Sequence, residues 1–225
     1  MTSHMKKLFF GFAFAICAIL TASSPAKADV VIWQDAHTGA VVSYPDTWVI
    51  ASNQDPDDVL TIKPRSGRAE AQCRLRMRPD GRNTIYPVRF QDDIQKVHYS
   101  AQFWDTYFRE FTNPDIKQMY DGAGIGNAFA GFAIANYTAE VPGPKMLRRG
   151  VAFAGNHFGE LYIFECSCHR DAFAKWKAQF LSVAGSVQMP KKYNEVMVGN
   201  YRNFLDEGVP PLKFKGKSSV QRMHY

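Results

Sequence analysis

The sequence lacks the short motifs that mark the common hydrolases, metalloproteases, nucleotide-binding proteins and calcium-binding proteins. It contains no G-x-S-x-G, no H-E-x-x-H, no phosphate-binding P-loop and no calcium-binding loop. No histidine beyond residue 28 lies in a recognised catalytic motif. We therefore expect a protein without catalytic activity and without a cofactor. A hydrolase that has no recognised motif is the last of the alternatives considered.

Long apolar runs are also missing, with one exception near the start. Residues 8–20 form an uncharged apolar run that is too short for a stable membrane-spanning helix. Two lysines precede this run, and Ala26-Lys27-Ala28 follows it as a small-x-small cleavage signature. Residues 1–28 are therefore predicted to be a cleavable signal peptide. The mature chain would begin at Asp29, contain no transmembrane segment and reside in the periplasm of a Gram-negative bacterium.

Cysteine is scarce, and one of the 4 cysteines, Cys17, would leave with the signal peptide. A lipid anchor at Cys17 is not expected, because the residue before it is Ile16 rather than a small residue. The mature chain keeps Cys73, Cys166 and Cys168. In an oxidising compartment we expect a disulfide, with Cys73–Cys166 as the first pairing and Cys73–Cys168 as the second.

Two other roles stay open for these cysteines. Cys168 precedes a predicted helix, whose dipole would favour the thiolate, so Cys168 could be a redox-reactive thiol with Cys166 as its resolving partner. Alternatively, Cys73, Cys166, Cys168 and His169 could bind zinc or copper, although their spacing is not that of a zinc finger. A periplasmic thiol-redox or metal-binding protein is therefore the main alternative function.

The positive net charge of +6 is unevenly distributed. Residues 1–28 hold three lysines and no acid, and residues 191–225 hold seven basic and three acidic residues. Residues 29–190 are consequently close to neutral. This distribution gives no support for a nucleic-acid partner of the domain.

The last part of the chain, residues 191–225, is predicted to be a short helix followed by a basic tail. Apolar residues recur with partial helical periodicity over residues 193–205, and Lys213, Lys215 and Lys217 follow a pair of prolines. One interpretation is a flexible terminus. The other is a basic arm that makes a peripheral contact with an anionic membrane or with a partner protein.

Strands are predicted from β-branched runs and from alternation of apolar and polar residues. They cover residues 30–34, 40–44, 48–52, 59–62, 69–78, 116–120, 129–141, 147–154 and 161–166. Residues 35–39 predict a hairpin turn between the first two strands. A helix is predicted over 90–111, where apolar residues recur at alternating spacings of four and three, and another over 171–185.

These elements predict an α+β fold. The strand 161–166 and much of 129–137 are apolar on both faces, so they need cover on both sides of a sheet. Two one-sided helices can supply this cover. We therefore expect, over residues 29–190, a mainly antiparallel sheet flanked by a helix on each face, which is an α/β/α sandwich.

Several short patterns occur in an order that is similar to a known family. They are Tyr44-Pro45-x-x-Trp48, Asn136-Tyr137, the arginine-bearing strand Met146–Val151, Gly159-Glu-Leu-Tyr162 and a closing amphipathic helix near Ser186-Val187. Together they resemble the PsbP-like family, which includes a lumenal photosystem II subunit and the periplasmic DcrB-like proteins. The resemblance spans residues 30–188. It implies an α/β/α sandwich, an exported or lumenal location and no catalysis, and it offers no catalytic residues to transfer.

Arg74, Arg76 and Arg78 alternate with apolar residues in the predicted strand 69–78, which is the pattern of a half-buried strand. One interpretation is a solvated face whose charge protects the sheet from aggregation. The other is an anion-binding stripe for lipid headgroups, lipopolysaccharide phosphate or an acidic partner.

Three further patterns receive structural interpretations. Gly122-Ala-Gly124-Ile-Gly126 departs from the phosphate-binding glycine pattern by one residue and predicts a turn or bulge. Asn136-Tyr-Thr138 matches a glycosylation triplet but lies in a predicted buried strand, so we regard it as a chance match. Asp55-Pro-Asp57-Asp58 is expected to be a solvated acidic loop rather than a metal site.

Taken together, these features predict an exported, non-catalytic binding or assembly protein of the bacterial cell envelope. Its partner is expected to be an envelope protein or an anionic envelope component.

Overall fold

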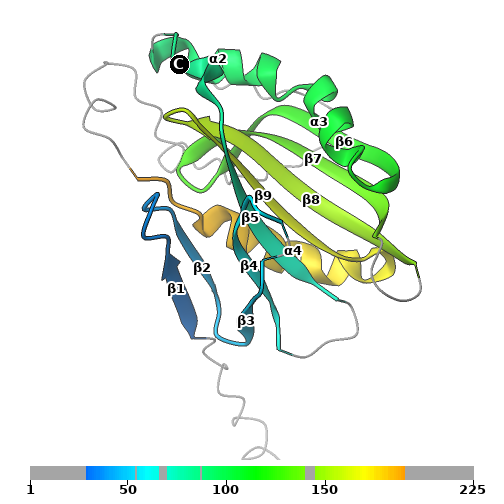
Figure 1. Cartoon of the computed structure of the whole chain (residues 1–225). Helices are drawn as coiled ribbons and strands as arrows, with labels where there is room; N and C mark the ends of the chain where they lie inside the picture. Colours follow the sequence, from blue (N-terminus) through cyan, green and yellow to red (C-terminus); the bar gives the residue numbers. More distant parts are fainter. Residues whose placement is uncertain (1–28, 54, 66–69, 87, 140–144, 191–225) are drawn as a thin grey trace, which may run out of the picture.

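A seven-stranded sheet forms the centre of the structure, and a separate two-stranded sheet lies beside it (Figure 1). The computed structural model describes residues 29–190 apart from 54, 66–69, 87 and 140–144. The strands are β1 (Val30–Gln34), β2 (Val41–Pro45), β3 (Trp48–Ala51), β4 (Asp58–Pro64), β5 (Gln72–Pro79), β6 (Thr112–Ile125), β7 (Ala128–Ala139), β8 (Met146–His157) and β9 (Glu160–His169). The helices are η1 (Gly81–Asn83), α2 (Val88–His98), α3 (Ala101–Phe108), η2 (Arg170–Ala172) and α4 (Phe173–Ser186).

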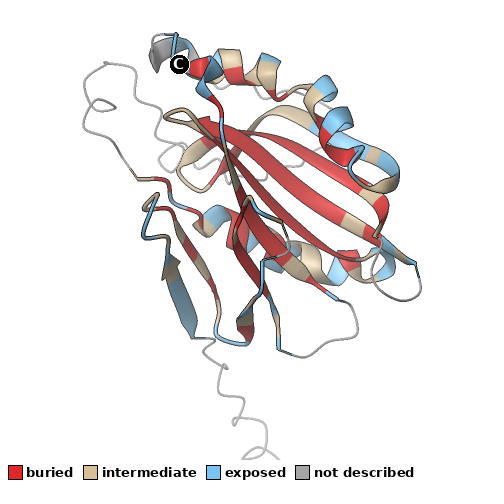
Figure 2. Ribbon diagram, in the orientation of Figure 1, coloured by how far each residue is buried: buried red, intermediate tan, exposed pale blue. Residues whose placement is uncertain are grey.

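The large sheet has the strand order β3-β4-β5-β9-β8-β7-β6, and all of its neighbouring strands are antiparallel. Helices α2 and α3 lie over one face, and α4 lies over the other (Figure 1). The central strands are consequently buried on both faces (Figure 2). The predicted α+β sandwich is confirmed, with two helices rather than one on the first face.

Alternation along β7 and β8 explains how the two faces differ. Phe132 and Phe153 point into the core under α4, whereas Ala133 and Ala152 point to the core under α3. The small alanine side chains leave room for large side chains of α3, of which Trp104 is 1% exposed. The α3 face therefore packs large helix side chains against small sheet side chains, whereas the α4 face packs large side chains of both layers together.

All nine predicted strands are present, and the largest difference in length is in β6. The sequence predicted a strand over 116–120, with Asn113-Pro114 ending the preceding helix. In the structure β6 already begins at Thr112 and includes Pro114. A proline is compatible with this position because β6 is an edge strand, where a missing N–H breaks no ladder on the open side.

The prediction of one continuous helix over 90–111 is wrong, because two helices, α2 and α3, cover this region. Ser100 has an extended backbone (φ −79°, ψ −167°), which separates α2 from α3. The predicted apolar stripe is buried in α3 but not in α2, where Val97 is 71% exposed. Gln95 and Tyr99 take the inward positions instead, and the Gln95 side chain accepts a 2.7 Å hydrogen bond from the Asn156 N–H of β8.

Gly131 of β7 lies directly under this helix break, and we expect Gly131→Ala to destabilise the protein. A Cβ at Gly131 would lie 2.8 Å from the backbone oxygen of Tyr99, which cannot move without shifting the helix. We expect a loss of about 1–3 kcal/mol in the free energy of unfolding, measured by urea denaturation. Gly122→Ala is the matched control, because nothing lies within 4 Å of the added atom there. Equal effects of the two substitutions would contradict this account.

The first two strands form the predicted hairpin. β1 pairs only with β2 among the described strands, and Val41 of β2 forms an isolated bridge with Gln188 after α4. The Gly122–Gly126 segment contains a register shift of β6 and the turn into β7, in agreement with the predicted turn or bulge. The Asn136–Thr138 triplet lies within β7. Among the described residues no helix is long and apolar enough to cross a membrane.

The predicted signal peptide (residues 1–28) and the predicted helix and tail (residues 191–225) lie outside the described residues. Both therefore stay predictions.

Candidate functional site

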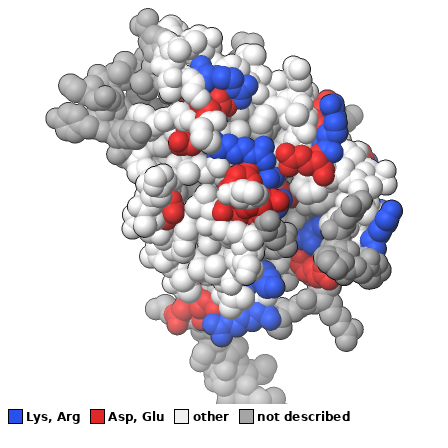
Figure 3. Space-filling view, in the orientation of Figure 1, with Lys and Arg blue, Asp and Glu red and all other residues white. Residues whose placement is uncertain are grey.

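Three arginine side chains of β5 lie against five carboxylates on the side of the sheet that α3 covers. We call this set the arginine–carboxylate cluster, and it consists of Arg74, Arg76, Arg78, Asp55, Asp57, Asp58, Glu110 and Glu165. On this side of the molecule basic and acidic side chains gather next to one another (Figure 3). The sequence patterns had singled out its three arginines and its three aspartates.

Four segments that are distant in the sequence build the cluster. β5 lies between β4 and β9, and its register places Arg74 directly opposite Glu165 of β9. The loop before β4 is fixed to β5 by a 2.9 Å hydrogen bond from the Met77 N–H to the Asp57 carbonyl oxygen. Glu110 follows α3, and its carboxylate contacts Arg76 and Arg78. Ordinary sheet pairing therefore brings the opposite charges together.

Arg74 is buried and bridges two carboxylates. Its Nη1 lies 2.9 Å from Asp55, and its Nη2 lies 3.1 Å from Glu165. The carboxylate of Asp58, whose side chain is fully buried, lies 3.9 Å from Nη1. Burial opposes the charged form of Arg74, but these neighbours outweigh it, and the pKa of the guanidinium is raised.

Arg76 and Arg78 share the carboxylate of Asp57. Arg76 donates to both Asp57 oxygens at 3.0 and 3.1 Å, and Arg78 Nε donates to one of them. Both arginines also reach Glu110, at 3.3 and 3.5 Å. Burial would raise the pKa of Asp57, yet the hydrogen bonds from the two guanidinium groups lower it below its ordinary value.

Glu165 is the innermost carboxylate of the cluster. It is 2% exposed and accepts hydrogen bonds from the Tyr107 hydroxyl at 2.6 Å and from the Tyr137 hydroxyl at 2.5 Å, besides the contact with Arg74. Burial alone would raise the pKa of Glu165, but Arg74 and the two hydroxyl donors lower it. The pKa of each tyrosine is raised by burial and by the negative charge of Glu165. Glu165 is therefore an ionised carboxylate inside the protein.

The expectation of a solvated arginine face is wrong for two of its three residues. Arg74 and Arg76 are 6% and 4% exposed, because the 55–58 loop and the end of α3 cover this face of β5. Their guanidinium groups already bind internal carboxylates, so they do not form the proposed solvent-facing stripe for external anions. Of the three, only Arg78, with its side chain 37% exposed, reaches solvent.

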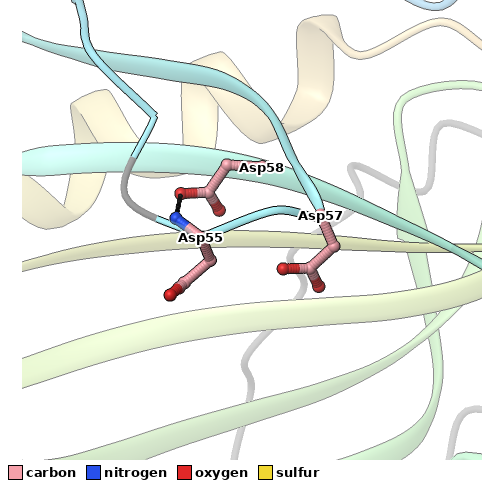
Figure 4. A group of neighbouring side chains, drawn as sticks. All are labelled: Asp55, Asp57 and Asp58. Carbon is pink, nitrogen blue, oxygen red and sulfur yellow. Dashed lines mark hydrogen bonds between the residues drawn. The ribbon is translucent and has the colours of Figure 1, made fainter.

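The expectation of a solvated acidic loop is also wrong in part. Asp55, Asp57 and Asp58 converge so that one oxygen from each lies within 4.8 Å of the others (Figure 4). The Asp55 N–H donates to Asp58 at 3.0 Å, and the Asp58 side chain is fully buried. The guanidinium groups of Arg74, Arg76 and Arg78 already lie beside these oxygens and offset much of their charge. The geometry is that of an internal ion-pair network rather than of a cation site.

The face of β5 opposite the arginines carries the disulfide. Cys73 and Cys166 are directly paired residues of β5 and β9, and the structure joins their sulfurs. This is the pairing that the sequence placed first. Both residues are fully buried in the core under α4. The same two strands thus hold an ion pair on one face and a disulfide on the other.

Cys168 does not have the properties expected of a reactive thiol. β9 continues through His169, so Cys168 lies in a strand and not at the start of α4, which begins at Phe173. The thiol is buried, and its Sγ–H contacts the backbone oxygen of His169 at 3.4 Å. Burial raises the pKa of Cys168 to about 11, which is opposite to the predicted lowering by a helix dipole.

Metal binding by Cys73, Cys166, Cys168 and His169 does not fit this arrangement. Cys73 and Cys166 have no thiolate to offer while they are bonded to each other. His169 is the N-cap of η2, where its Nδ1 accepts a hydrogen bond from the Asp171 N–H at 3.4 Å. The disulfide therefore does not favour the alternative thiol-redox or metal-binding function.

Sequence reasoning missed the carboxylates and hydroxyls that complete the cluster, which are Glu110, Glu165, Tyr107 and Tyr137. One signal was available for Glu165, which is a single charged residue within the otherwise uncharged strand segment 161–168. A charge in such a strand requires a buried partner of opposite charge. The identity of that partner depends on the register of β5 and β9, which the sequence does not specify.

No protein-family model matches the chain. No curated protein matches its sequence either. The structural matches include a PsbP protein, CyanoP, from the cyanobacterium Synechocystis, with 14% identity and a TM-score of 0.48, covering 76% of this chain and 98% of that one. PsbP proteins are the family that the sequence resembles.

A second structural match is LpqN of Mycobacterium tuberculosis, which is described as involved in cell envelope biogenesis. It has 12% identity and a TM-score of 0.42, and the match covers 75% of this chain and 88% of LpqN. A protein of unknown function from Pseudomonas aeruginosa matches with 13% identity and a TM-score of 0.38 over 72% of this chain and 98% of its own. Likenesses at this level do not assign a function to this chain.

Proposed function

We propose that this chain is an exported, non-catalytic binding or assembly protein of the cell envelope. The observation that carries the proposal is the buried disulfide between Cys73 and Cys166. Such bonds form and persist in oxidising compartments outside the cytoplasm. The signal-peptide pattern of residues 1–28 supports the same location from an independent part of the chain.

The electrostatics of the arginine–carboxylate cluster support a structural role for it rather than acid–base catalysis. A general acid or base works best when its pKa lies near neutrality. Among the described residues, the shifted carboxyl pKa values are all lowered, and the shifted tyrosine and cysteine pKa values are all raised. Every one of these shifts moves away from neutrality. The arginine–carboxylate cluster therefore has the properties of a structural network.

Export and the disulfide can be tested together on the full-length chain expressed in a Gram-negative host. We expect to find the protein in the periplasmic fraction. Its mass should be that of a chain that begins at Asp29. After denaturation without reductant, a maleimide reagent should label one thiol, that of Cys168, and after reduction it should label three. The reason is that Cys17 leaves with the signal peptide while Cys73 and Cys166 are oxidised.

The matched control is a chain that starts at Asp29 without residues 1–28. It should stay in the cytoplasm, where the thiol pools keep cysteines reduced, and all three of its thiols should react without reductant. Retention of the full-length chain in the cytoplasm with its thiols reduced would overturn the proposal.

A further inference from the structure

Within the described part of the chain, one edge of β1 has no neighbouring strand. Among the described strands it pairs with β2 alone. Val30 and Ile32 are 61% and 71% exposed, although both are apolar. Figure 2 shows the contrast between this exposed strand and the buried strands of the large sheet.

The backbone of β2 reveals which groups of β1 point to the open side. The Ser43 N–H donates to the Ser186 hydroxyl oxygen at 3.0 Å, and the Ser43 carbonyl oxygen accepts from that hydroxyl at 2.7 Å. Val41 exchanges hydrogen bonds with Gln188 at 2.9 and 2.8 Å. The N–H and C=O groups of Ser43 and Val41 therefore point away from β1.

In an antiparallel pair, residues that lie opposite each other either exchange hydrogen bonds or both point outward. Ile32 lies opposite Ser43, and Gln34 lies opposite Val41. Ile32 and Gln34 must therefore direct their N–H and C=O groups to the open edge, and by alternation Val30 does the same. The edge of β1 presents donors and acceptors at every second residue.

The other sheet edges have protection that β1 lacks. β6 carries a proline, several charged residues and register shifts, and β3 has only four residues. Charge, proline, bulges and short length are the usual means of preventing an edge from pairing. β1 has no charge, no proline and no register shift against β2. Among the described residues, nothing therefore prevents another strand from pairing with this edge.

We infer that β1 pairs antiparallel with β1 of a second copy of this chain, around a two-fold axis at Ile32. This register places Ile32 opposite Ile32 and Val30 opposite Gln34 of the second copy, so every outward N–H and C=O group in these positions finds a partner. Because Val30–Gln34 is uncharged, no like charges face each other within the paired strands. Just beyond them Asp29 lies opposite Asp35 of the second copy, which weakens the pairing. The result is one continuous sheet with the strand order β2-β1-β1-β2, which has the closed symmetry of a two-fold dimer.

Cysteine cross-linking of the full-length chain in a C168A background tests this register. Hydrogen-bonded pairs have Cα atoms about 5.5 Å apart, which suits a disulfide. I32C should therefore cross-link with itself. V30C and Q34C should cross-link when mixed but not alone. I50C is the matched control, because Ile50 is apolar and 55% exposed on another strand. Cross-linking of I32C no stronger than that of I50C would overturn the inference.

A proline variant tests the edge without disturbing the hairpin. The pairing buries few residues, so we expect a weak dimer with a Kd on the order of 100 μM in sedimentation equilibrium. Ile32→Pro removes an outward N–H and should weaken the dimer by about tenfold or more, with an unchanged urea midpoint. Val31→Pro removes an N–H that points to Tyr44, so it should unfold the hairpin instead. An unmodified chain that stays monomeric at about 500 μM, or an I32P variant that dimerises normally, refutes the pairing.

Discussion

Replacing Cys73 and Cys166 together by alanine is expected to lower the free energy of unfolding by about 3–5 kcal/mol, measured by urea denaturation. The two cysteines are 93 residues apart, so the disulfide closes a long loop and removes much conformational freedom from the unfolded chain. Both sulfurs also lie in the core under α4, where their removal leaves space. The greater freedom of the unfolded chain and the space left in the core both lower the free energy of unfolding.

Reduction of the unmodified protein provides the control for this prediction. Reductant should shift its urea midpoint in the same direction as the double substitution, and C73A/C166A should then be insensitive to reductant. C168A should lose as much stability on reduction as the unmodified chain, because Cys168 takes no part in the bond. An unmodified chain whose midpoint does not change on reduction would show that the disulfide contributes nothing to stability.

Glu165→Gln is expected to cost about 3–5 kcal/mol in the free energy of unfolding. Glutamine keeps nearly the same volume and can still accept from Tyr107 and Tyr137, but it removes the charge that Arg74 contacts at 3.1 Å. Arg74 is 6% exposed, so solvent cannot replace the lost partner. The cost arises because the buried guanidinium loses the carboxylate beside Nη2 and keeps only Asp55 and Asp58, which lie on the side of Nη1.

Glu110→Gln is the matched control for Glu165→Gln. Glu110 also contacts an arginine of the cluster, at 3.3 Å, but its side chain is 45% exposed. Exposed ion pairs contribute little, so we expect a change below about 1 kcal/mol. Equal losses in the free energy of unfolding for E165Q and E110Q would disprove the claim that burial decides the cost.

The pH dependence of unfolding gives a second measurement of the same residue. Folding lowers the pKa of Glu165, so its ionised form stabilises the protein at pH values above its unfolded pKa. This stability is lost as the pH falls below the ordinary glutamate pKa and through the folded one. Asp57 acts in the same direction. We expect the urea midpoint of the unmodified protein to decrease in this acid range, and that of E165Q to decrease less steeply.

The sequence predicted the strands well because their signals are local. Alternation over a few residues revealed β5 correctly, including which side chains share a face. It did not reveal that the arginine face is covered. Arg74 contacts Asp55 and Glu165, which are 19 and 91 residues away, and the covering loop and helix are brought there by the fold. Alternation of apolar and polar residues indicates which side chains share a face of a strand. It does not indicate which other segments cover that face.

The helix region shows the opposite case, in which a local signal was misleading. The 4-3 apolar spacing continues across Ser100, so the sequence predicted one helix over 90–111. The structure interrupts it because Tyr99 is drawn into the core, with its hydroxyl 3.1 Å from Asp80 and its backbone close to Gly131. These contacts outweigh the exposure of Val97, which the apolar stripe had placed inward.

The sequence by itself determined the nine strands, the α+β class and the leading cysteine pair, because apolar periodicity and residue type act through neighbouring residues. Only the tertiary structure decided that Arg74 and Arg76 are internal ion-pair partners, that Cys168 is a buried thiol with a raised pKa and that β1 pairs with β2 alone among the described strands. The physical reason is common to all three. Burial, pairing and edge position are properties of segments that meet in space, and strand order and register decide which segments meet.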